Sequence, residues 1–294
     1  MYCHDCPRSC GVDRRNTTGR CHAGPVARVA CIMRHFWEEP CISGTQGSGA
    51  IFFSGCNLGC VFCQNHTIRN GAVGKIYSEY ELAERMLHLQ NLGVHNINLV
   101  TATPHLRTVL SALEYAKLKG LSLPVVYNTS AYEKLESLRL LDGLVDIYLP
   151  DIKFLSSARS ERFASAPDYA DFALPALSEM HRQVGSLRLD ECSIATRGLL
   201  VRHLILPCCV DDARAVLDAL AARIPLDTQL SLMRQYTPTP YTKAPPLNRS
   251  ITGREYERTV SYALSLGFHN LYLQDSSSAT TAYTPSFSEF TELQ

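Results

Sequence analysis

Short runs of apolar residues alternate with longer amphipathic stretches over most of this chain, from Gly49 onward. Residues 51–53 and 204–206 are continuously apolar, as in strands that are covered on both faces. The pattern predicts strands at residues 50–54, 96–100, 124–128, 145–149, 199–206, 229–233 and 270–273. Between them it predicts helices at residues 78–92, 105–118, 168–184, 211–222 and 254–266.

The order of these elements indicates the fold class. Strands that alternate with helices along a chain are typical of parallel βαβ units. Ser78 and Glu81 have the spacing of a capping box, which supports a helix start there. We therefore expect an α/β protein with a parallel sheet or barrel. The stretch from Asp275, rich in Ser and Thr, is expected to be a loop or tail near the barrel mouth.

Charge and composition limit the partners and the cellular compartment that we expect for the protein. Among its 294 residues, 28 basic side chains balance 28 acidic ones, so neither nucleic acid nor a membrane surface is expected as a partner. No secretory signal or membrane-spanning apolar run is apparent, which predicts a soluble, cytoplasmic protein. That reducing compartment disfavours disulfides among the 12 cysteines. Clustered cysteines then suggest metal ligands, and the scattered Cys192, Cys208 and Cys209 suggest buried small side chains.

Composition divides the chain near residue 45. Residues 1–45 are rich in cysteine and show no helical or strand period, whereas residues 46–294 carry the alternating pattern. We predict that the first part is a metal-binding segment because four of its cysteines have the spacing C-x2-C-x3-C-x10-C. These are Cys3, Cys6, Cys10 and Cys21. The set suits a structural zinc or a second iron–sulfur cluster better than free thiols. His22 can replace one thiolate, and Cys31 and Cys41 have no assigned place.

Three further cysteines stand close together after the first predicted strand. Cys56, Cys60 and Cys63 have the spacing C-x3-C-x2-C. Thiolates ligate soft metals, and a cubane iron–sulfur cluster takes one cysteine per iron. Three cysteines leave one iron without a protein ligand, and an open position of this kind can bind and activate a small molecule. The alternatives are three ligands of a zinc site with a remote fourth, and chance clustering.

Polar residues recur where the predicted strands end. They are Thr101 and Thr103, Asn128 and Thr129, and Asp151 and Lys153. Arg202 lies within an apolar strand, where it must meet an anion or an acid from a neighbouring strand. Taken singly, these residues fit a surface ion pair or turn chemistry. Taken together at one end of a barrel, they are better explained by a shared ligand.

These landmarks together resemble the radical S-adenosylmethionine (radical SAM) superfamily. Within it, the chain is most similar to the pyruvate formate-lyase activating enzyme-like branch, in a subgroup with a cysteine-rich start. The resemblance covers most of the chain. Its motifs are Cys-His-Asp-Cys-Pro-Arg-Ser-Cys at 3–10, Glu-Glu-Pro-Cys-Ile-Ser-Gly at 38–44, Ser-Gly-Cys-Asn-Leu-Gly-Cys-Val-Phe-Cys-Gln-Asn at 54–65, Asn-Ile-Asn-Leu-Val-Thr at 96–101, Val-Tyr-Asn-Thr-Ser-Ala-Tyr-Glu at 126–133, Tyr-Leu-Pro-Asp-Ile-Lys at 148–153, Val-Arg-His-Leu-Ile-Leu-Pro at 201–207 and Leu-Met-Arg-Gln-Tyr-Thr-Pro at 232–238.

The resemblance implies a partial (β/α)6 TIM-like barrel with a [4Fe–4S] cluster on Cys56, Cys60 and Cys63. SAM would then occupy the open iron, with Phe62 beside its adenine. The remaining cofactor-binding residues that it implies are Asn65, Thr101, Thr103, Asn128, Asp151, Lys153 and Arg202. One departure is apparent, because many relatives carry a Gly-Gly-Glu type segment where this chain has Thr-Ala-Thr-Pro-His at 101–105. A fixed negative charge for the methionyl ammonium is missing from that segment.

By the same resemblance, the leading hypothesis is a radical SAM enzyme. A reduced cluster would cleave SAM to methionine and a 5′-deoxyadenosyl radical, which abstracts hydrogen from a substrate. A reductant of the flavodoxin or ferredoxin type is the expected partner. The substrate is either a glycine of a glycyl-radical enzyme, or another peptide or small molecule. Many glycyl-radical activases carry ferredoxin-like insertions after the cluster loop, whereas this chain has no cysteine between Cys63 and Cys192. The rival hypothesis is a non-catalytic iron–sulfur or zinc protein.

Overall fold

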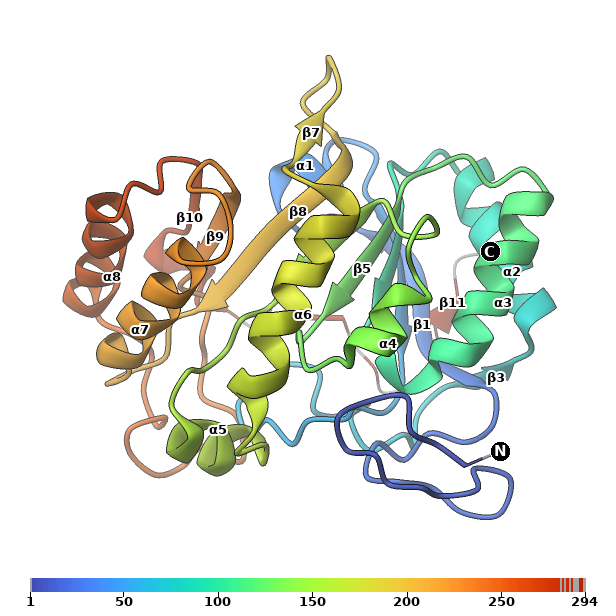
Figure 1. Ribbon diagram of the computed structural model, residues 1–294, viewed down its shortest axis with the longest axis horizontal. Helices are drawn as coiled ribbons and strands as arrows, with labels where there is room; N and C mark the ends of the chain where they lie inside the picture. The colour runs from blue at the N-terminus through green and yellow to red at the C-terminus, as the bar shows by residue number, and fades with distance from the viewer. Residues whose placement is uncertain (1, 281, 283, 286, 288–290, 293–294) are drawn as a thin grey trace.

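The computed structural model describes residues 2–280, 282, 284–285, 287 and 291–292 (Figure 1). Its strands are β1 (Ala27–His35), β2 (Ser48–Phe53), β3 (Lys75–Tyr77), β4 (Ile97–Val100), β5 (Val125–Thr129), β6 (Ile147–Pro150), β7 (Arg188–Leu189), β8 (Ala195–Leu204), β9 (Gln229–Met233), β10 (Leu271–Leu273) and β11 (Thr291–Glu292). Its α-helices are α1 (Pro40–Ser43), α2 (Glu79–Asn91), α3 (Leu106–Leu118), α4 (Leu135–Arg139), α5 (Ser157–Ala164), α6 (Tyr169–Val184), α7 (Val210–Ala221) and α8 (Gly253–Ser265). Two 3-10 turns, η1 (Thr103–His105) and η2 (Ser276–Ser278), complete the elements described.

One sheet organises the molecule, with its main strands in the order β10-β9-β8-β6-β5-β4-β2-β1-β11. From β2 to β10, each strand is parallel to its neighbours in this order. Because β10 and β11 end the order, the described strands form an open, partial barrel. The α/β class and the partial TIM-like barrel expected from the sequence are therefore confirmed.

The hydrophobic pattern located the seven predicted strands and five predicted helices, with ends that shift by a few residues, but it missed α4 and α5. The capping box is present, since Ser78 N donates to the Glu81 carboxylate at 2.9 Å and Glu81 N donates to Ser78 Oγ at 3.3 Å. The prediction that residues 1–45 hold no strand is wrong. β1 runs antiparallel to β2, and six of its nine residues are buried, four of them in succession, with no strict alternation. A strand covered on both faces gives no period of two in the sequence.

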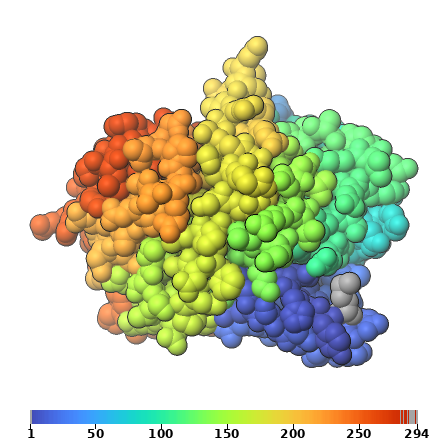
Figure 2. Space-filling model, viewed as in Figure 1, coloured from blue at the N-terminus to red at the C-terminus, as the bar shows by residue number. Residues whose placement is uncertain are grey.

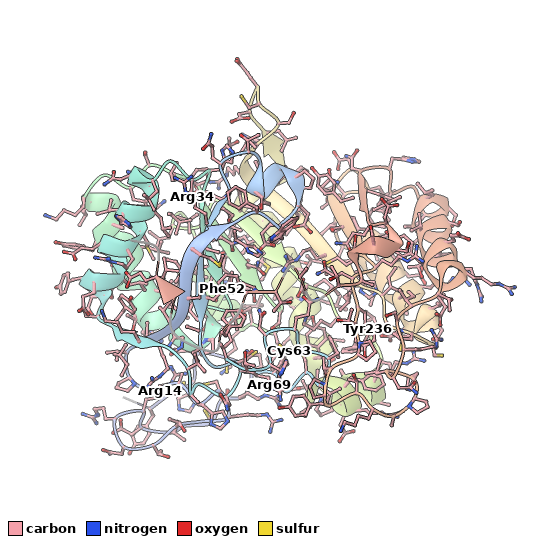
Figure 3. All side chains as sticks on the ribbon, turned by 180° about the vertical axis from the view of Figure 1, so that it is seen from behind. Arg14, Arg34, Phe52, Cys63, Arg69 and Tyr236 are labelled. Carbon is pink, nitrogen blue, oxygen red and sulfur yellow. The ribbon has the colours of Figure 1, made fainter. Side chains whose placement is uncertain are left out.

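The two faces of the sheet carry different side chains. Ile51 and Phe53 point to the face that the helices cover, where they join the main hydrophobic core. Ala50 and Phe52 point to the other face, which is concave. Figure 1 shows the helices in front of the sheet, and Figure 3 shows Phe52 on the face seen from behind. No helix among the described residues is long and apolar enough to cross a membrane.

Residues 36–44 close the amino-terminal end of the barrel. Because β1 runs against the parallel strands, it brings the chain to that end, where α1 begins at Pro40. Cys41 and Ile42 then pack in one apolar cluster with Val126 of β5 and Ile147 of β6. The carboxyl ends of the parallel strands stay available for the long loops.

The segment before β1 lies across those carboxyl ends, below α3 and α4 in Figures 1 and 2. Arg14 donates to the carbonyl of Pro104, beside the start of α3. Lys134 Nζ donates to the carbonyl of His4 at 3.0 Å, and Ser137 Oγ to that of Asp5 at 2.6 Å. The segment is therefore held by hydrogen bonds to the barrel rather than by an apolar core of its own.

Two leucines of α3 test the packing of helices on the sheet. Leu113 is fully buried in the main core, whereas Leu118 on the same helix is 84% exposed. We expect Leu113→Ala to lower the free energy of unfolding by about 2–5 kcal/mol because it leaves a cavity. Leu118→Ala, the matched control, should change it by less than about 0.5 kcal/mol. Denaturant unfolding measures both, and equal effects would contradict this arrangement of the core.

Candidate active site

The cysteines of the C-x3-C-x2-C motif lie in the irregular loop after β2, at the carboxyl end of that strand. In parallel barrels this end carries the chemistry, because the strand-to-helix loops gather there. The backbone N–H groups of Gly59 and Val61 donate to the last carbonyls of α5 at 2.8 and 2.9 Å. Gly55 has a φ of +96°, and a Cβ there would meet the carbonyl oxygen of Cys21. The loop, called the cluster loop below, is thus fixed between α5 and the N-terminal segment.

All three thiols of the cluster loop line one cavity of about 220 Å³. Figure 3 shows Cys63 and Arg69 at the same end of the molecule, on the concave side of the sheet. The same cavity is lined by almost every other site residue that the sequence indicated. These are Phe62, Asn65, Thr101, Asn128, Asp151, Lys153 and Arg202. The structure therefore brings together residues from β2, β4, β5, β6 and β8.

Burial governs the acidity of the three thiols. Loss of hydration raises the pKa of Cys56 to about 11 and that of Cys60 to about 12. It raises the pKa of Cys63 as well, and the positive charge of Lys153 opposes the rise at all three sulfurs. Thiols of this kind stay protonated in water but lose the proton when a metal binds. Lys153 therefore places a positive charge beside the three sulfurs, which would be negatively charged as thiolates.

The donor set of the cluster loop fits an iron–sulfur cluster. Within the described part of the chain, no three His, Cys, Asp or Glu side chains converge closely enough to hold a single metal ion. A zinc ion needs such convergence, with each sulfur at about 2.3 Å. A cubane cluster binds each cysteine through a different iron, so its three ligands need not meet at one point. Three thiols that line one cavity are therefore a donor set that fits three irons of such a cluster.

Asp151, Lys153 and Arg202 form a charged network in the wall of the cavity. Lys153 Nζ lies 2.9 Å from Asp151 Oδ2, and Arg202 Nε donates to Asp151 Oδ1 at 2.7 Å. The side chains are only 11–23% exposed, so this is no surface ion pair. Although burial alone would raise it, the charges of Arg202 and Lys153 lower the pKa of Asp151. Arg202 therefore has the acid partner that the sequence allowed as an alternative, and it also faces the cavity.

Glu38 is a site residue that the sequence analysis missed. Its Oε2 accepts from Arg202 Nη1 at 2.9 Å, and its Oε1 accepts from Asn98 and Asn128 at 3.0 and 3.1 Å. The side chain is 9% exposed and lines the cavity. It reaches this position because residues 36–44 close the barrel from the opposite end. The negative charge that is absent from residues 101–105 is thus present in the cavity, on a different segment.

Thr103 does not line the cavity with the other expected cofactor-binding residues. It is buried in η1, and its Oγ1 donates to Glu133 Oε1 at 2.5 Å. Thr129 Oγ1 donates to the same oxygen at 2.5 Å. Desolvation of the fully buried Glu133 raises its pKa to about 7, and these hydroxyl donors oppose the rise. The hydroxyl groups of Thr103 and Thr129 therefore donate to the buried carboxyl group of Glu133.

Phe62 lies between the cluster loop and the wall of the barrel. Its ring is 5% exposed and packs edge-on against Phe154, with 5.9 Å between the ring centroids. Lys153 Nζ lies 5.9 Å from the centroid of the same ring, on the side of the charged network. The aromatic position before Cys63 thus forms an apolar surface inside the cavity.

All 12 cysteines of the chain are free thiols in this structure. Cys31 and Cys41, which the sequence left unassigned, lie in apolar clusters on the concave side of the sheet. Of the scattered cysteines, Cys209 is buried as predicted. The prediction is wrong for Cys192 and Cys208, which are exposed. Both lie outside strands and helices, in turns that hydrophobicity alone does not distinguish from core positions.

Known proteins resemble this chain in sequence and in fold. An uncharacterized protein of Methanocaldococcus jannaschii is 28% identical over 284 residues, which is 92% of this chain and 76% of the relative. SuiB of Streptococcus suis, solved bound to precursor peptide SuiA, has a similar fold with a TM-score of 0.50 at 11% identity. That match covers 75% of this chain and 46% of SuiB. A domain of pyruvate-formate lyase-activating enzyme from Bacteroides vulgatus matches with a TM-score of 0.42 at 11% identity, over 58% of this chain and 92% of that domain.

Residues 50–183 match the sequence profile of the Radical SAM superfamily. The matched range begins in β2, contains the cluster loop, and ends in α6, so it also includes Asn128, Asp151 and Lys153. This match covers 134 of the 294 residues, so this part of the chain is similar to the Radical SAM superfamily. The similarity agrees with the donor set of the cavity, where three thiols fit three irons of a [4Fe–4S] cluster.

The charged network predicts that Arg202 is needed for stability. Arg202→Ala would leave Asp151 and Glu38 buried without their shared partner, so we expect the free energy of unfolding to fall by about 3–5 kcal/mol. Arg159→Ala is the control, since Arg159 pairs with the largely exposed Asp211 and should cost about 1 kcal/mol or less. Denaturant unfolding of the two variants measures the difference. An unfolding midpoint of Arg202→Ala equal to that of the wild type would contradict the network.

Glu133 predicts a pH dependence of stability. Its pKa is about 7 in the folded protein against 4.5 for the free side chain, so folding favours the protonated form. This contribution is complete below pH 4.5 and is lost as the pH rises through about 7, to a total of about 3 kcal/mol. We expect Glu133→Gln to flatten the decline in melting temperature between pH 5 and 8, and a decline of unchanged slope would refute this origin.

Proposed function

We propose that this chain is an enzyme of the pyruvate formate-lyase activating enzyme-like kind. It would reductively cleave SAM at a [4Fe–4S] cluster and abstract hydrogen from a glycine of a partner glycyl-radical enzyme. One observation carries the proposal: three thiols and a buried network of two acids and two cations line the same cavity. A protein that only stores or carries electrons has no need for such a network beside an open iron.

The chain's own side chains have separable tasks in this reaction. Cys56, Cys60 and Cys63 would hold three irons and leave the fourth open to SAM. When bound, the reduced cluster and SAM supply methionine and the 5′-deoxyadenosyl radical. Lys153 and Arg202 offer hydrogen-bond donors to a carboxylate, while Asp151 and Glu38 accept from an ammonium or hydroxyl groups.

The lining of the cavity also supports a substrate site next to the cofactor site. Beyond the residues assigned to SAM, the wall continues through His35, Trp37, Met233 and Gln235. Trp37 is 59% exposed, so the cavity reaches the surface of the molecule at this side. An opening of this kind suits a backbone glycine presented on a loop of a partner protein, with a flavodoxin or ferredoxin type protein as the reductant. Modification of another peptide is the second candidate, and SuiB, a protein of similar fold, was solved with a precursor peptide.

Anaerobic reconstitution with iron, sulfide, SAM and a strong reductant tests the reaction class. The wild type should release 5′-deoxyadenosine, and Cys60→Ala should release none because three ligands are the minimum that holds the cubane. Cys209→Ala removes another buried thiol, at the start of α7, and should retain wild-type release. Wild-type yields from Cys60→Ala would exclude the cluster loop as the reaction site.

The substrate is tested separately, with a candidate glycyl-radical enzyme added to the active mixture. Activation predicts an electron paramagnetic resonance doublet of a glycyl radical on the partner, and 5′-deoxyadenosine formed in step with it. Release of 5′-deoxyadenosine without any partner radical would favour the peptide candidate, to be tested by mass spectrometry of added peptides.

A further inference from the structure

Residues 2–24 form a small fold of their own around four cysteines. Cys3 N donates to the carbonyl of Val12 at 2.9 Å, and Gly11 N donates to the carbonyl of Cys3 at 2.9 Å, so the two strands of a tight hairpin face each other. Between them the chain turns where Ser9 N donates to the carbonyl of Cys6 at 3.0 Å. This hairpin brings Cys3, Cys6 and Cys10 into one region of space.

The fourth cysteine joins this group from the following loop. Cys10 Sγ packs against Gly19, where even one added Cβ would lie only 2.5 Å from the sulfur. Burial raises the pKa values of Cys6 and Cys21, and neighbouring thiolates would raise them further, from Cys21 at Cys6 and from Cys3 and Cys10 at Cys21. Cys3, Cys6, Cys10 and Cys21 are called the N-terminal thiol group below.

Burial of these thiols is not explained by packing in an apolar core. Cys3, Cys6 and Cys21 are 5%, 5% and 4% exposed. Among the described residues, none of the three belongs to the hydrophobic clusters of the protein. Their burial is instead produced by a short, polar segment wrapped around the sulfurs. A segment with so little apolar surface requires a staple to be ordered.

We propose that the N-terminal thiol group holds a second iron–sulfur cluster, beside the cluster loop. Four thiolates supply one ligand to each iron of a cubane, so this cluster would have no open iron. A zinc ion bound by the same four thiolates is the alternative, and the metal analysis described below distinguishes the two.

The surroundings of the N-terminal thiol group agree with this assignment. Arg14 Nη2 lies 3.8 Å from Cys21 Sγ and supplies positive charge beside ligands that are negative when metal is bound. The carbonyl of Cys21 also lies directly over Gly55, next to Cys56, so the two metal centres would be neighbours. The proposal goes beyond the proposed function, because it concerns ligands outside the active cavity.

Metal analysis of anaerobically purified full-length protein tests the proposal. We expect about eight irons and eight sulfides per chain in the wild type and no stoichiometric zinc. Cys6→Ala and, as a second variant, Cys21→Ser should each lose about half of this iron. The triple variant C56A/C60A/C63A should lose the other half. Cys192→Ala is the control, because that thiol is exposed on the β7–β8 hairpin and should leave the iron content unchanged.

A wild-type measurement keeps the test decisive if Cys6→Ala fails to fold. In the intact protein, Cys3, Cys6, Cys10 and Cys21 should resist alkylation until the clusters are oxidised and chelated. About four irons in the wild type, all lost in the triple variant, would overturn the proposal, as would zinc at the N-terminal thiols. Failure of the proposed function would give different measurements. In that case the triple variant would keep all the iron of the wild type, or the loaded wild type would release no 5′-deoxyadenosine.

Discussion

The buried guanidinium of Arg202 is the interaction on which the interior of this barrel depends. It joins β8 to Asp151 after β6, to Asn128 of β5 and to Glu38 of the segment that closes the amino-terminal end of the barrel. A charge this deeply buried is tolerated only when all its partners are in place. The pairing therefore fixes the relative positions of parallel strands that are not adjacent in sequence. It also leaves the remaining N–H groups of the guanidinium beside the cavity that the cluster loop borders.

The N-terminal part of the chain contributes to the barrel from both of its ends. β1 and α1 fill the amino-terminal end, where Glu38 enters the charged network. The segment before β1 covers the carboxyl-terminal end and touches the cluster loop at Gly55. A division of the chain at residue 45 separates two regions of different composition. It does not separate two structural units, because residues 27–35 pair within the sheet. The cysteine-rich segment and the barrel therefore act on the same site from opposite sides.

The negative charge of the cavity shows how one chemical requirement can be met from another segment. Residues 101–105 carry no acid, and Thr101 takes a φ of +62° at the rim of the cavity. Glu38 brings a carboxylate to the same interior from the far end of the barrel. In this chain the carboxylate within hydrogen-bonding reach of the cavity thus comes from the segment before α1.

Local sequence determined the parts of this protein whose signals are short in range. The period of apolar residues located the strands and helices of the barrel, because burial of one face or both leaves its mark on neighbouring residues. The spacing of Cys56, Cys60 and Cys63 indicated the cluster loop, since three ligands within one loop need no distant partner. Only the tertiary structure decided which polar residues share the cavity. Glu38 and Arg202 are far apart in sequence and meet through β1 and the sheet order, while Thr103 turns away to the buried Glu133. No local pattern encodes such contacts, because they depend on how the elements pack.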